Sequence, residues 1–330
     1  MIADLLPQSS DLSPPNVEAV REIDNRIADI LRPPGALARL DQTASWLAGW
    51  QGTSTPSVER PHGLIFAADH GVVAEGVSAF PADVTAAMLT AFEASQASVS
   101  ALASVAGAAI TAIDVGVGNP TGNIRVEPAL DHDRFTTAFI AGREAVKRLD
   151  TDLLILGEMG IGNSTPAAAV SMALVGGAPS DFVGRGTGID DDRYATKVAV
   201  VADACQRIAD DAEPLEVLRQ VGGAELVAIT GAMVEARLRS IPVLLDGYIA
   251  TSPGLVLHAI SPDLISNCRA GHCSAEPGHR LALDHLGLTP LLTLDMRLGE
   301  GSGAMAAVPL VKMACALVND VPTFTEWFSG

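Results

Sequence analysis

The residues best placed to do chemistry lie in a glycine-rich segment that follows a short apolar run. Residues 153–156 are Leu-Leu-Ile-Leu, and Gly157, Gly160 and Gly162 come next, with Glu158 between the first two of them. Four consecutive apolar residues are typical of a strand that is buried on both faces. Glycines let the backbone approach a ligand closely. The carboxylate of Glu158 inside the turn indicates that the ligand contains other groups besides a phosphate.

Residues 163–166 (Asn-Ser-Thr-Pro) are typical of a helix start. A strand, a glycine turn and a helix N-terminus together present free amides to an anion such as phosphate. The same turn can also serve only as a tight connection in an α/β fold. Its spacing matches neither the dinucleotide fingerprint nor the Walker loop, so nothing here supports a dinucleotide or ATP site.

Two further glycine-rich segments carry charged residues. Residues 183–190 precede a predicted helix that holds Lys197, which could supply a point charge to a phosphate, although a plain turn and a solvated lysine would give the same pattern. Glu300 lies between glycines, directly before an apolar helix predicted from 304 to 317. Burial there would raise its pKa and suit it to proton transfer. Alternatively, Glu300 is a helix N-terminal carboxylate stabilised by the dipole.

Residues 272–279 are dense in polar groups, and a hydrogen-bonded loop explains them as well as a site does. A zinc hydrolase built on His272, Cys273 and His279 is a further alternative. A second ligand pair at suitable spacing is missing, so we predict no metal. The four cysteines of this long chain are predicted to be free thiols.

Composition bounds the kind of partner. The chain has 330 residues, 48% of them hydrophobic and 18% charged, which is typical of a compact protein. A formal net charge of −18 argues against binding to nucleic acid or an anionic membrane. The first residues lack a signal-peptide pattern. The most apolar window, 97–117, predicts a packed helix followed by a strand and not a membrane span.

The pattern from residue 61 onward predicts alternating strands and helices. Apolar runs at 63–68, 109–113, 153–156, 241–245 and 290–294 each lead into a polar, glycine-containing loop. Such runs predict a Rossmann-like α/β fold, an open parallel sheet with helices on both faces, whose ligands bind at the carboxyl edge.

Upstream, helices are predicted at 17–31 and 37–50, after a frayed lead at 1–15. We therefore predict a small helical domain from 1–60, completed by 304–330, and a catalytic α/β domain from 61–303.

Taken together, the motifs resemble the nicotinate-nucleotide:dimethylbenzimidazole phosphoribosyltransferases, which make the lower-ligand nucleotide of cobalamin. The matching stretches follow the family's order over nearly the whole chain: 32–35, 68–72, 76–81, 156–165, 183–190, 272–279 and 297–304. Any one of them alone is a weak signal, whereas all seven in register are specific.

The resemblance implies that the enzyme transfers phosphoribose from nicotinate mononucleotide to a benzimidazole-type base, with Glu300 as general base and no cofactor or metal. Glu158 would stabilise positive charge on the ribose. The ribose phosphate would be held by Gly157, Met159, Gly160, Ile161, Gly162, Asn163, Gly186 and Lys197, with Ser274 at the nicotinate end. The benzimidazole slot would be bordered by Ser78, Phe80, Met88 and Leu298. The resemblance further implies a cytoplasmic homodimer.

The chain departs from the family pattern in a few places. Ala87 replaces a common glutamine, Ser95-Gln96 replaces a glycine pair, and Arg32 replaces a lysine. Ala87 leaves the identity of the accepted base open. A non-catalytic or regulatory nucleotide-binding homologue is the alternative, and the retention of Glu300, Glu158 and Lys197 argues against it.

Overall fold

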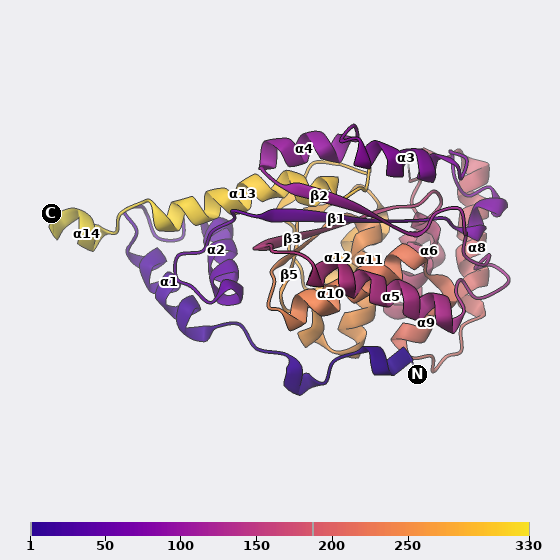
Figure 1. The fold of residues 1–330 in the computed structure, drawn as a ribbon, viewed down its shortest axis with the longest axis horizontal. Coiled ribbons are helices and arrows are strands. Elements are labelled where there is room, and N and C mark those ends of the chain that lie inside the picture. Colours follow the sequence, from indigo (N-terminus) through magenta and orange to yellow (C-terminus); the bar gives the residue numbers. More distant parts are fainter. Residues whose placement is uncertain (1, 187, 330) are drawn as a thin grey trace.

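The computed structural model describes residues 2–186 and 188–329. Its centre is a parallel sheet of five strands in the order β2-β1-β3-β4-β5. The bounds are β1 Pro61–Ala68, β2 Ala109–Gly116, β3 Leu153–Met159, β4 Val243–Leu245 and β5 Cys268–Ala270. Helices cover both faces (Figure 1). The predicted open parallel α/β sheet is confirmed.

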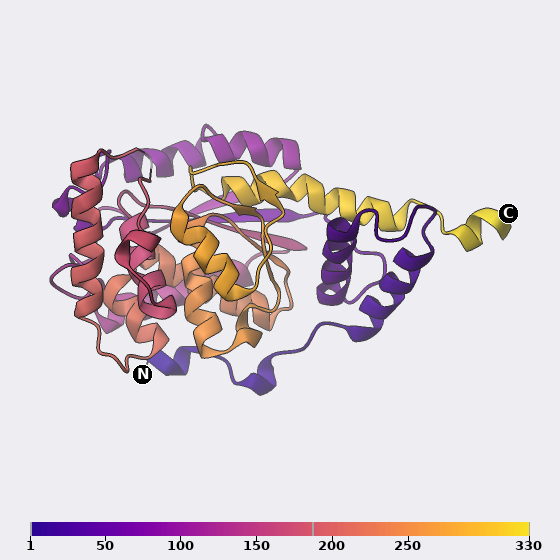
Figure 2. The same cartoon turned by 180° about the vertical axis from the view of Figure 1, so that it is seen from behind.

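Side chains that alternate along the strands enter two different cores. Leu64 and Phe66 of β1 pack in the larger core, whereas Ile65 packs in the core on the opposite face. The larger core is formed with α10 Ala224–Leu238 and α11 Tyr248–Ile260, and α5 His132–Lys147 packs against α10. The opposite face is covered by α3 Val84–Glu93, α4 Ser98–Ala106 and α13 Ser302–Asn319 (Figure 2).

The remaining helices lie around this frame. The α-helices are α6 Ser164–Val175, α7 Pro179–Phe182, α8 Asp191–Gln206, α9 Pro214–Val221 and α12 Pro277–Leu286. Short 3₁₀ helices are η1 Ile2–Leu5, η2 Ser9–Asp11, η3 Gly71–Glu75 and η4 Pro262–Ile265.

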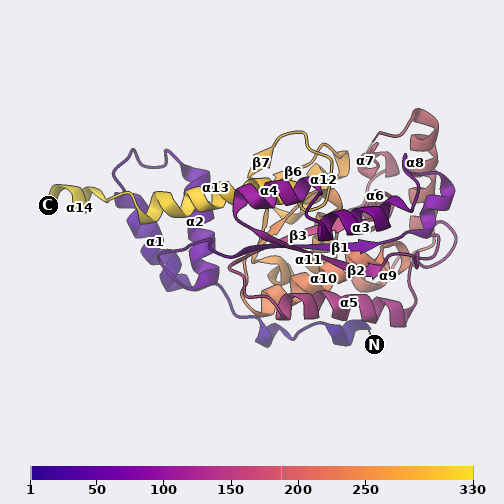
Figure 3. The ribbon, with the colours of Figure 1, turned by 45° about the horizontal axis from the view of Figure 1, so that its top comes forward.

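The prediction that residues 290–294 form a strand of the main sheet is wrong. Within them, β7 Leu292–Thr293 pairs with β6 His272–Cys273 in a separate two-stranded sheet, beside α12 and α13 (Figure 3). The fifth main strand is β5, just before β6. At Gly271, between them, a Cβ would lie 2.6 Å from the Cα of Ala304, so the close packing against α13 requires glycine there. Strands β5 and β6 are too short for a periodic sequence pattern to reveal them.

The prediction of a frayed lead at 1–15 is also wrong. Ile2, Leu5, Leu6 and Leu12 pack against the larger core, and η1 contacts α5 and α9. Four apolar side chains in this segment were the available signal, and their irregular spacing matches neither a helix nor a strand.

The two predicted N-terminal helices are confirmed as α1 Val17–Asp29 and α2 Ala38–Gln51. Together with the C-terminal half of α13 they form a small core of their own, consisting of Ile23, Ile30, Ala44, Ala48, Ala314 and Val318. The N-terminal half of α13 packs instead on the sheet. Helix α13 thus contributes to both cores. The predicted division into a helical domain (1–60 with 304–330) and a catalytic domain (61–303) stays a prediction.

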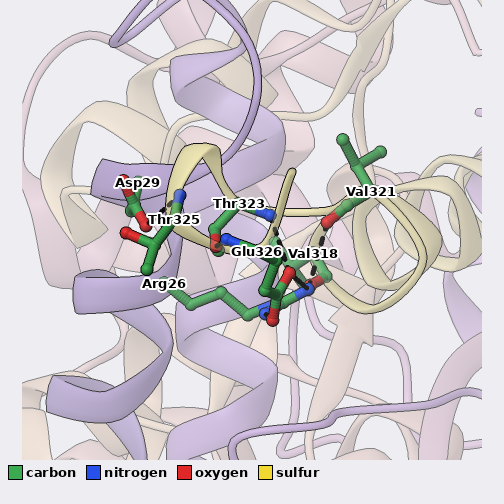
Figure 4. A network of polar contacts seen from close by, with 7 residues as sticks. All are labelled: Arg26, Asp29, Val318, Val321, Thr323, Thr325 and Glu326. Carbon is green, nitrogen blue, oxygen red and sulfur yellow. Dashed lines mark hydrogen bonds and ion pairs between the residues drawn. The ribbon is translucent and has the colours of Figure 1, made fainter. Parts of the chain in front are cut away.

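Polar contacts attach the C-terminal helix α14 Phe324–Ser329 to α1 (Figure 4). Arg26 donates from Nη1 to Glu326 Oε1 at 2.8 Å and from Nε to the Val318 carbonyl at 2.6 Å. The Thr325 amide donates to Asp29 Oδ2 at 3.2 Å. One arginine therefore holds α1, the end of α13 and α14 together.

Among the described residues, α13 is long and apolar enough to cross a membrane by length and composition alone. However, 56% of this 18-residue helix is buried inside the protein. Such burial is typical of a core helix, and α13 indeed packs against both the sheet and α2.

Candidate active site

A cavity of about 290 Å³ opens at the carboxyl edge of the sheet. Loops that follow β1, β3, β4, β6 and β7 form its walls. Every residue predicted for the site lines this cavity except Gly157: Ser78, Phe80, Met88, Glu158, Met159, Gly160, Ile161, Gly162, Asn163, Gly186, Lys197, Ser274, Leu298 and Glu300. Residues far apart in the sequence thus meet at one place, as the parallel-sheet prediction requires.

The glycine turn after β3 is confined on several sides. A Cβ on Gly160 would lie 2.7 Å from the Ala68 carbonyl oxygen, and Gly162 has a φ of +87°, so both positions require glycine. The Ile161 amide donates to Thr85 Oγ1 at 3.2 Å. The helix start predicted at 163–166 is confirmed, with Asn163 at the N-cap position of α6, although its side chain makes no cap hydrogen bond.

Glu158 lies beneath this turn and is only 4% exposed. Asn163 Nδ2 donates a hydrogen bond to its Oε2. Burial raises the pKa of Glu158 to about 8, against the lowering effect of the Asn163 hydrogen bond and with smaller contributions from the charges of Asp246, Glu225 and Glu300. Glu158 is therefore mainly protonated at pH 7 in this state of the site.

Glu300 is held in an unusual backbone conformation. Its φ is +65°, and the flanking Gly299 and Gly301 are also left-handed. The Glu300 amide donates to the Glu158 carbonyl at 3.2 Å. The side chain is 6% exposed, and its Oε2 has no hydrogen-bond partner among the described residues. Burial raises the pKa of Glu300; the Val99 amide opposes this rise, and the charge of Asp246 adds to it.

The alternative that Glu300 serves as the helix N-terminal carboxylate of α13 is wrong. Asp246 does this instead, because its Oδ1 accepts the Ala304 amide at 2.8 Å and its Oδ2 accepts the Gly301 amide at 3.2 Å. The Glu300 carboxylate is thereby left facing the cavity with one oxygen unpaired. A buried carboxylate with an unpaired oxygen is expensive for the fold and typical of a group kept for function.

Lys197, on α8, is not the solvated lysine of the alternative interpretation. It is 1% exposed, and its Nζ donates to Ser164 Oγ at 2.8 Å and to the Gly184 carbonyl at 3.2 Å. Burial lowers the pKa of Lys197 to about 8, and the negative charge of Glu276 opposes this lowering. A buried ammonium beside the glycine turn suits an anionic ligand.

The second glycine turn borders Lys197. The Gly186 amide donates to Glu276 Oε1 at 3.0 Å, and the Gly186 carbonyl accepts from Arg297 Nη1 at 2.7 Å. Thr187, which belongs to the predicted turn 183–190, lies outside the described residues. Arg185 also lines the cavity, and it forms an ion pair with Asp191 at 2.5 Å.

The polar segment 272–279 forms a hydrogen-bonded loop. His279 Nδ1 accepts the Ser274 amide at 2.8 Å, and its Nε2 lies 3.1 Å from Thr251 Oγ1. Burial lowers the pKa of His279 to about 3, so the ring is neutral. Both ring nitrogens are thus engaged by protein. Within residues 2–186 and 188–329, no group of three metal-ligating side chains converges, which gives the zinc alternative no support.

The wall of the cavity that is predicted to bind the acceptor base is apolar and open to solvent. Phe80 is 47% exposed and Leu298 is 49% exposed, and Met88 and Ser78 line the cavity near them. Ala87, which was expected to affect the base pocket, is exposed and does not line the cavity.

Sequence reasoning missed several lining or supporting residues. Glu276 lies in the motif 272–279 and Arg297 in the motif 297–304, but the sequence analysis predicted no role for either residue. Tyr248 and His272 line the cavity as well, and His272 was considered only as a zinc ligand. Asp246 had a signal, since it directly follows the predicted strand 241–245 and precedes a glycine.

The fold and site define an α/β protein with a cavity at the carboxyl edge of its sheet, lined by two glycine-rich turns, a buried lysine and buried carboxylates. A family model described as phosphoribosyltransferase matches residues 12–327. The chain is 45% identical to the nicotinate-nucleotide–dimethylbenzimidazole phosphoribosyltransferase of Cereibacter sphaeroides, over 94% of this chain and 92% of that one. It is 46% identical to the enzyme of the same name from Novosphingobium aromaticivorans, with the same coverage of both chains. The crystal structure of CobT from Thermus thermophilus superposes with a TM-score of 0.91 at 40% identity, covering 94% of this chain and 98% of that chain.

The chain therefore belongs to the nicotinate-nucleotide–dimethylbenzimidazole phosphoribosyltransferase family, and it is a pentosyltransferase.

The raised pKa of Glu158 predicts a pH-dependent cost in stability. The unfolded chain ionises this carboxyl near its ordinary value of 4.5, whereas the folded chain does so at about 8, so folding becomes less favourable as pH rises between these values. We expect Glu158→Gln to gain roughly 2 to 4 kcal/mol of unfolding free energy relative to wild type between pH 5 and pH 8. Urea unfolding across this range measures the difference, with Glu93→Gln on the exposed surface as control. A constant difference would contradict the raised pKa.

Proposed function

We propose that this enzyme transfers the phosphoribosyl group of nicotinate mononucleotide to dimethylbenzimidazole or a related base, giving α-ribazole phosphate and nicotinate for cobalamin synthesis. The names of relatives that match nearly the whole chain support this assignment. The observation that carries it is the buried carboxylate of Glu300 with its unpaired Oε2, which lines the same cavity as the glycine turn and Lys197.

The nucleotide binds with its phosphate at the end of the cavity formed by the turn 159–163, Gly186 and Lys197. Amides at the start of α6 and the Lys197 ammonium supply the positive field in an otherwise acidic protein. Ser274 borders the nicotinate end, where His279 holds its amide. The acceptor base lies against Ser78, Phe80, Met88 and Leu298, because this wall is apolar and suits a flat uncharged ring.

Glu300 acts as the general base. It takes the N–H proton of the benzimidazole while the other ring nitrogen attacks C1′ of the ribose, and the bond from C1′ to nicotinate breaks. Attack from the side opposite the leaving group inverts C1′, which gives the α-linked product. The nicotinate ring is a cationic pyridinium in the mononucleotide, so its departure requires no protonation. Holding the two rings in line supplies much of the acceleration.

Glu158 stabilises the positive charge that develops on the ribose. Its raised pKa keeps it neutral before the nucleotide binds, which avoids adding a further negative charge to those of Glu300 and Asp246. A bound pyridinium nucleotide favours the ionised form, because an opposite charge nearby lowers the pKa of a carboxyl.

A non-catalytic or regulatory nucleotide-binding homologue is the alternative function. It predicts binding of nicotinate mononucleotide without any release of nicotinate when a benzimidazole is added. Incubation of the purified protein with both compounds, followed by chromatography of the free nicotinate, tests the proposal. Absence of release would favour the alternative. A panel of benzimidazoles, purines and phenols in the same assay identifies the accepted base.

Glu300→Gln removes the base but keeps the size of the side chain. We expect kcat to fall about 100-fold or more, because general-base catalysis contributes factors of this order. The dissociation constant of nicotinate mononucleotide, measured by calorimetry, should change little. Unchanged turnover would rule out Glu300 as the base.

Lys197→Ala removes the ammonium at the phosphate end. We expect the KM for nicotinate mononucleotide to rise about tenfold or more with a smaller effect on kcat, because the lost contact is made in both the ground and transition states. Lys147→Ala, on the exposed surface of α5, is the matched control. A selective loss of affinity for the benzimidazole would contradict the phosphate role.

The homodimer expected from the resemblance stays a proposal, as does the cytoplasmic location. Aromatic side chains on α14 support association, since Trp327 is 61% exposed and Phe328 is 77% exposed. Sedimentation equilibrium should give twice the chain mass of 34.0 kDa, and removal of both aromatic side chains should weaken the dimer. A monomer at micromolar concentration would contradict this proposal.

A further inference from the structure

The carboxylate of Asp246 has no part in the reaction proposed above, yet it is 1% exposed and lies next to the general base. It directly follows β4, and its two oxygens accept the amides of Ala304 and Gly301. His272 Nε2 of β6 lies 3.4 Å from its Oδ1. This one side chain therefore connects the end of β4, β6 and the segment that carries Glu300.

The segment it holds is conformationally demanding. Residues 299, 300 and 301 all have positive φ, and for Glu300 this conformation is unfavourable because it carries a Cβ. The chain here lies so close to β3 that a Cβ on Gly157 would be 2.5 Å from the Gly301 nitrogen. Contacts on both sides of Glu300 are required to maintain such a backbone: its own amide to the Glu158 carbonyl, and the next amide to Asp246.

Charged and titratable groups approach Glu300 from three elements. Glu158 lies at the end of β3, Asp246 follows β4, and His272 of β6 packs against Asp246. The Val99 amide of α4 and the Asp246 carboxylate act on Glu300 in opposite directions, the first stabilising its negative charge and the second destabilising it. Asp246 thus affects both where Glu300 lies and how strongly it holds a proton.

We propose that Asp246 is a positioning residue for Glu300: it fixes the backbone of residues 299–301 through the Gly301 and Ala304 amides and places a second negative charge beside the base. This inference rests on the proposed function. A negative neighbour makes Glu300 a stronger base, which favours proton removal from the weakly acidic benzimidazole N–H.

Two substitutions separate the two effects. Asp246→Asn removes the charge and one of the amide contacts, whereas Asp246→Glu keeps the charge but displaces it by one methylene. We expect both to lower kcat about tenfold or more, because small misplacements of a catalytic group are costly. In Asp246→Asn the acidic limb of the pH profile of kcat should also move to lower pH, since loss of the negative charge lowers the pKa of Glu300. In Asp246→Glu this limb should stay in place.

Asp152→Asn is the matched control, since Asp152 also accepts two backbone amides, those of Glu59 and Arg60, at the opposite end of the sheet. It should lower stability without moving the pH profile. All four proteins are assayed with the same two substrates, so the titration of the substrates is common to every curve. Circular dichroism verifies that each variant is folded.

A wild-type kcat and acidic limb in folded Asp246→Asn would overturn the positioning role. If Asp246→Asn does not fold, a wild-type kcat in Asp246→Glu would overturn it. Failure of the proposed function would be distinguished from failure of the positioning role, because the wild-type enzyme itself would then release no nicotinate.

Discussion

The site depends on the close approach of two backbone segments, the end of β3 and the loop before α13. Gly157 meets Gly301 and the carbonyl carbon of Glu300 so closely that any side chain on Gly157 would overlap them. This contact explains why Gly157 does not line the cavity, although it is essential to its geometry. It brings Glu158 and Glu300, which are 142 positions apart in the sequence, into one buried acidic group. The carboxyl edge of a parallel sheet supplies the location, and glycine permits the contact.

Burial of several carboxylates together sets the electrostatics of this group. Glu158, Asp246 and Glu300 are each less than a tenth exposed, and Lys197, at the other end of the cavity, is the buried cation among the described lining residues. Each carboxylate is stabilised differently: Glu158 by protonation and Asn163, and Asp246 by the amides of α13. Glu300 retains an unpaired oxygen. Three chemically similar side chains therefore stand in three different environments, and such differences allow carboxylates of one site to take different roles at the same pH.

The sequence predicted the long strands and the glycine turns, because an apolar run of fixed length and a run of glycines are local signals. The family resemblance carried by the motif 156–165 implied the cavity-lining residues 158–163 of the β3 turn but not Ser164, which also lines the cavity. Sequence reasoning failed for β5 and β6, which have only three and two residues, and it assigned the segment of β7 to the main sheet. In the structure β5 pairs with β4, whereas β6 and β7 pair with each other in a separate sheet. Asp246 was missed because its role is defined by the amides of residues 301 and 304, and no local pattern connects these positions. The hydrogen bond from Asn163 to Glu158 was not predicted, because a cap residue and a carboxylate partner look the same in sequence.

An acidic pocket is a coherent environment for the proposed reaction. The leaving group is a pyridinium and the ribose becomes cationic in the transition state, so negative charge near C1′ is stabilising where it would be harmful in a site for an anionic nucleophile. The phosphate of the same nucleotide needs the opposite field. In the proposed binding mode Lys197, which contacts Ser164 at the start of α6, and the amides of this helix start supply that field. A net charge of −18 therefore does not conflict with the proposed phosphorylated substrate, because one cavity lined by both buried carboxylates and a buried ammonium can meet the opposite needs of the two ends of one ligand.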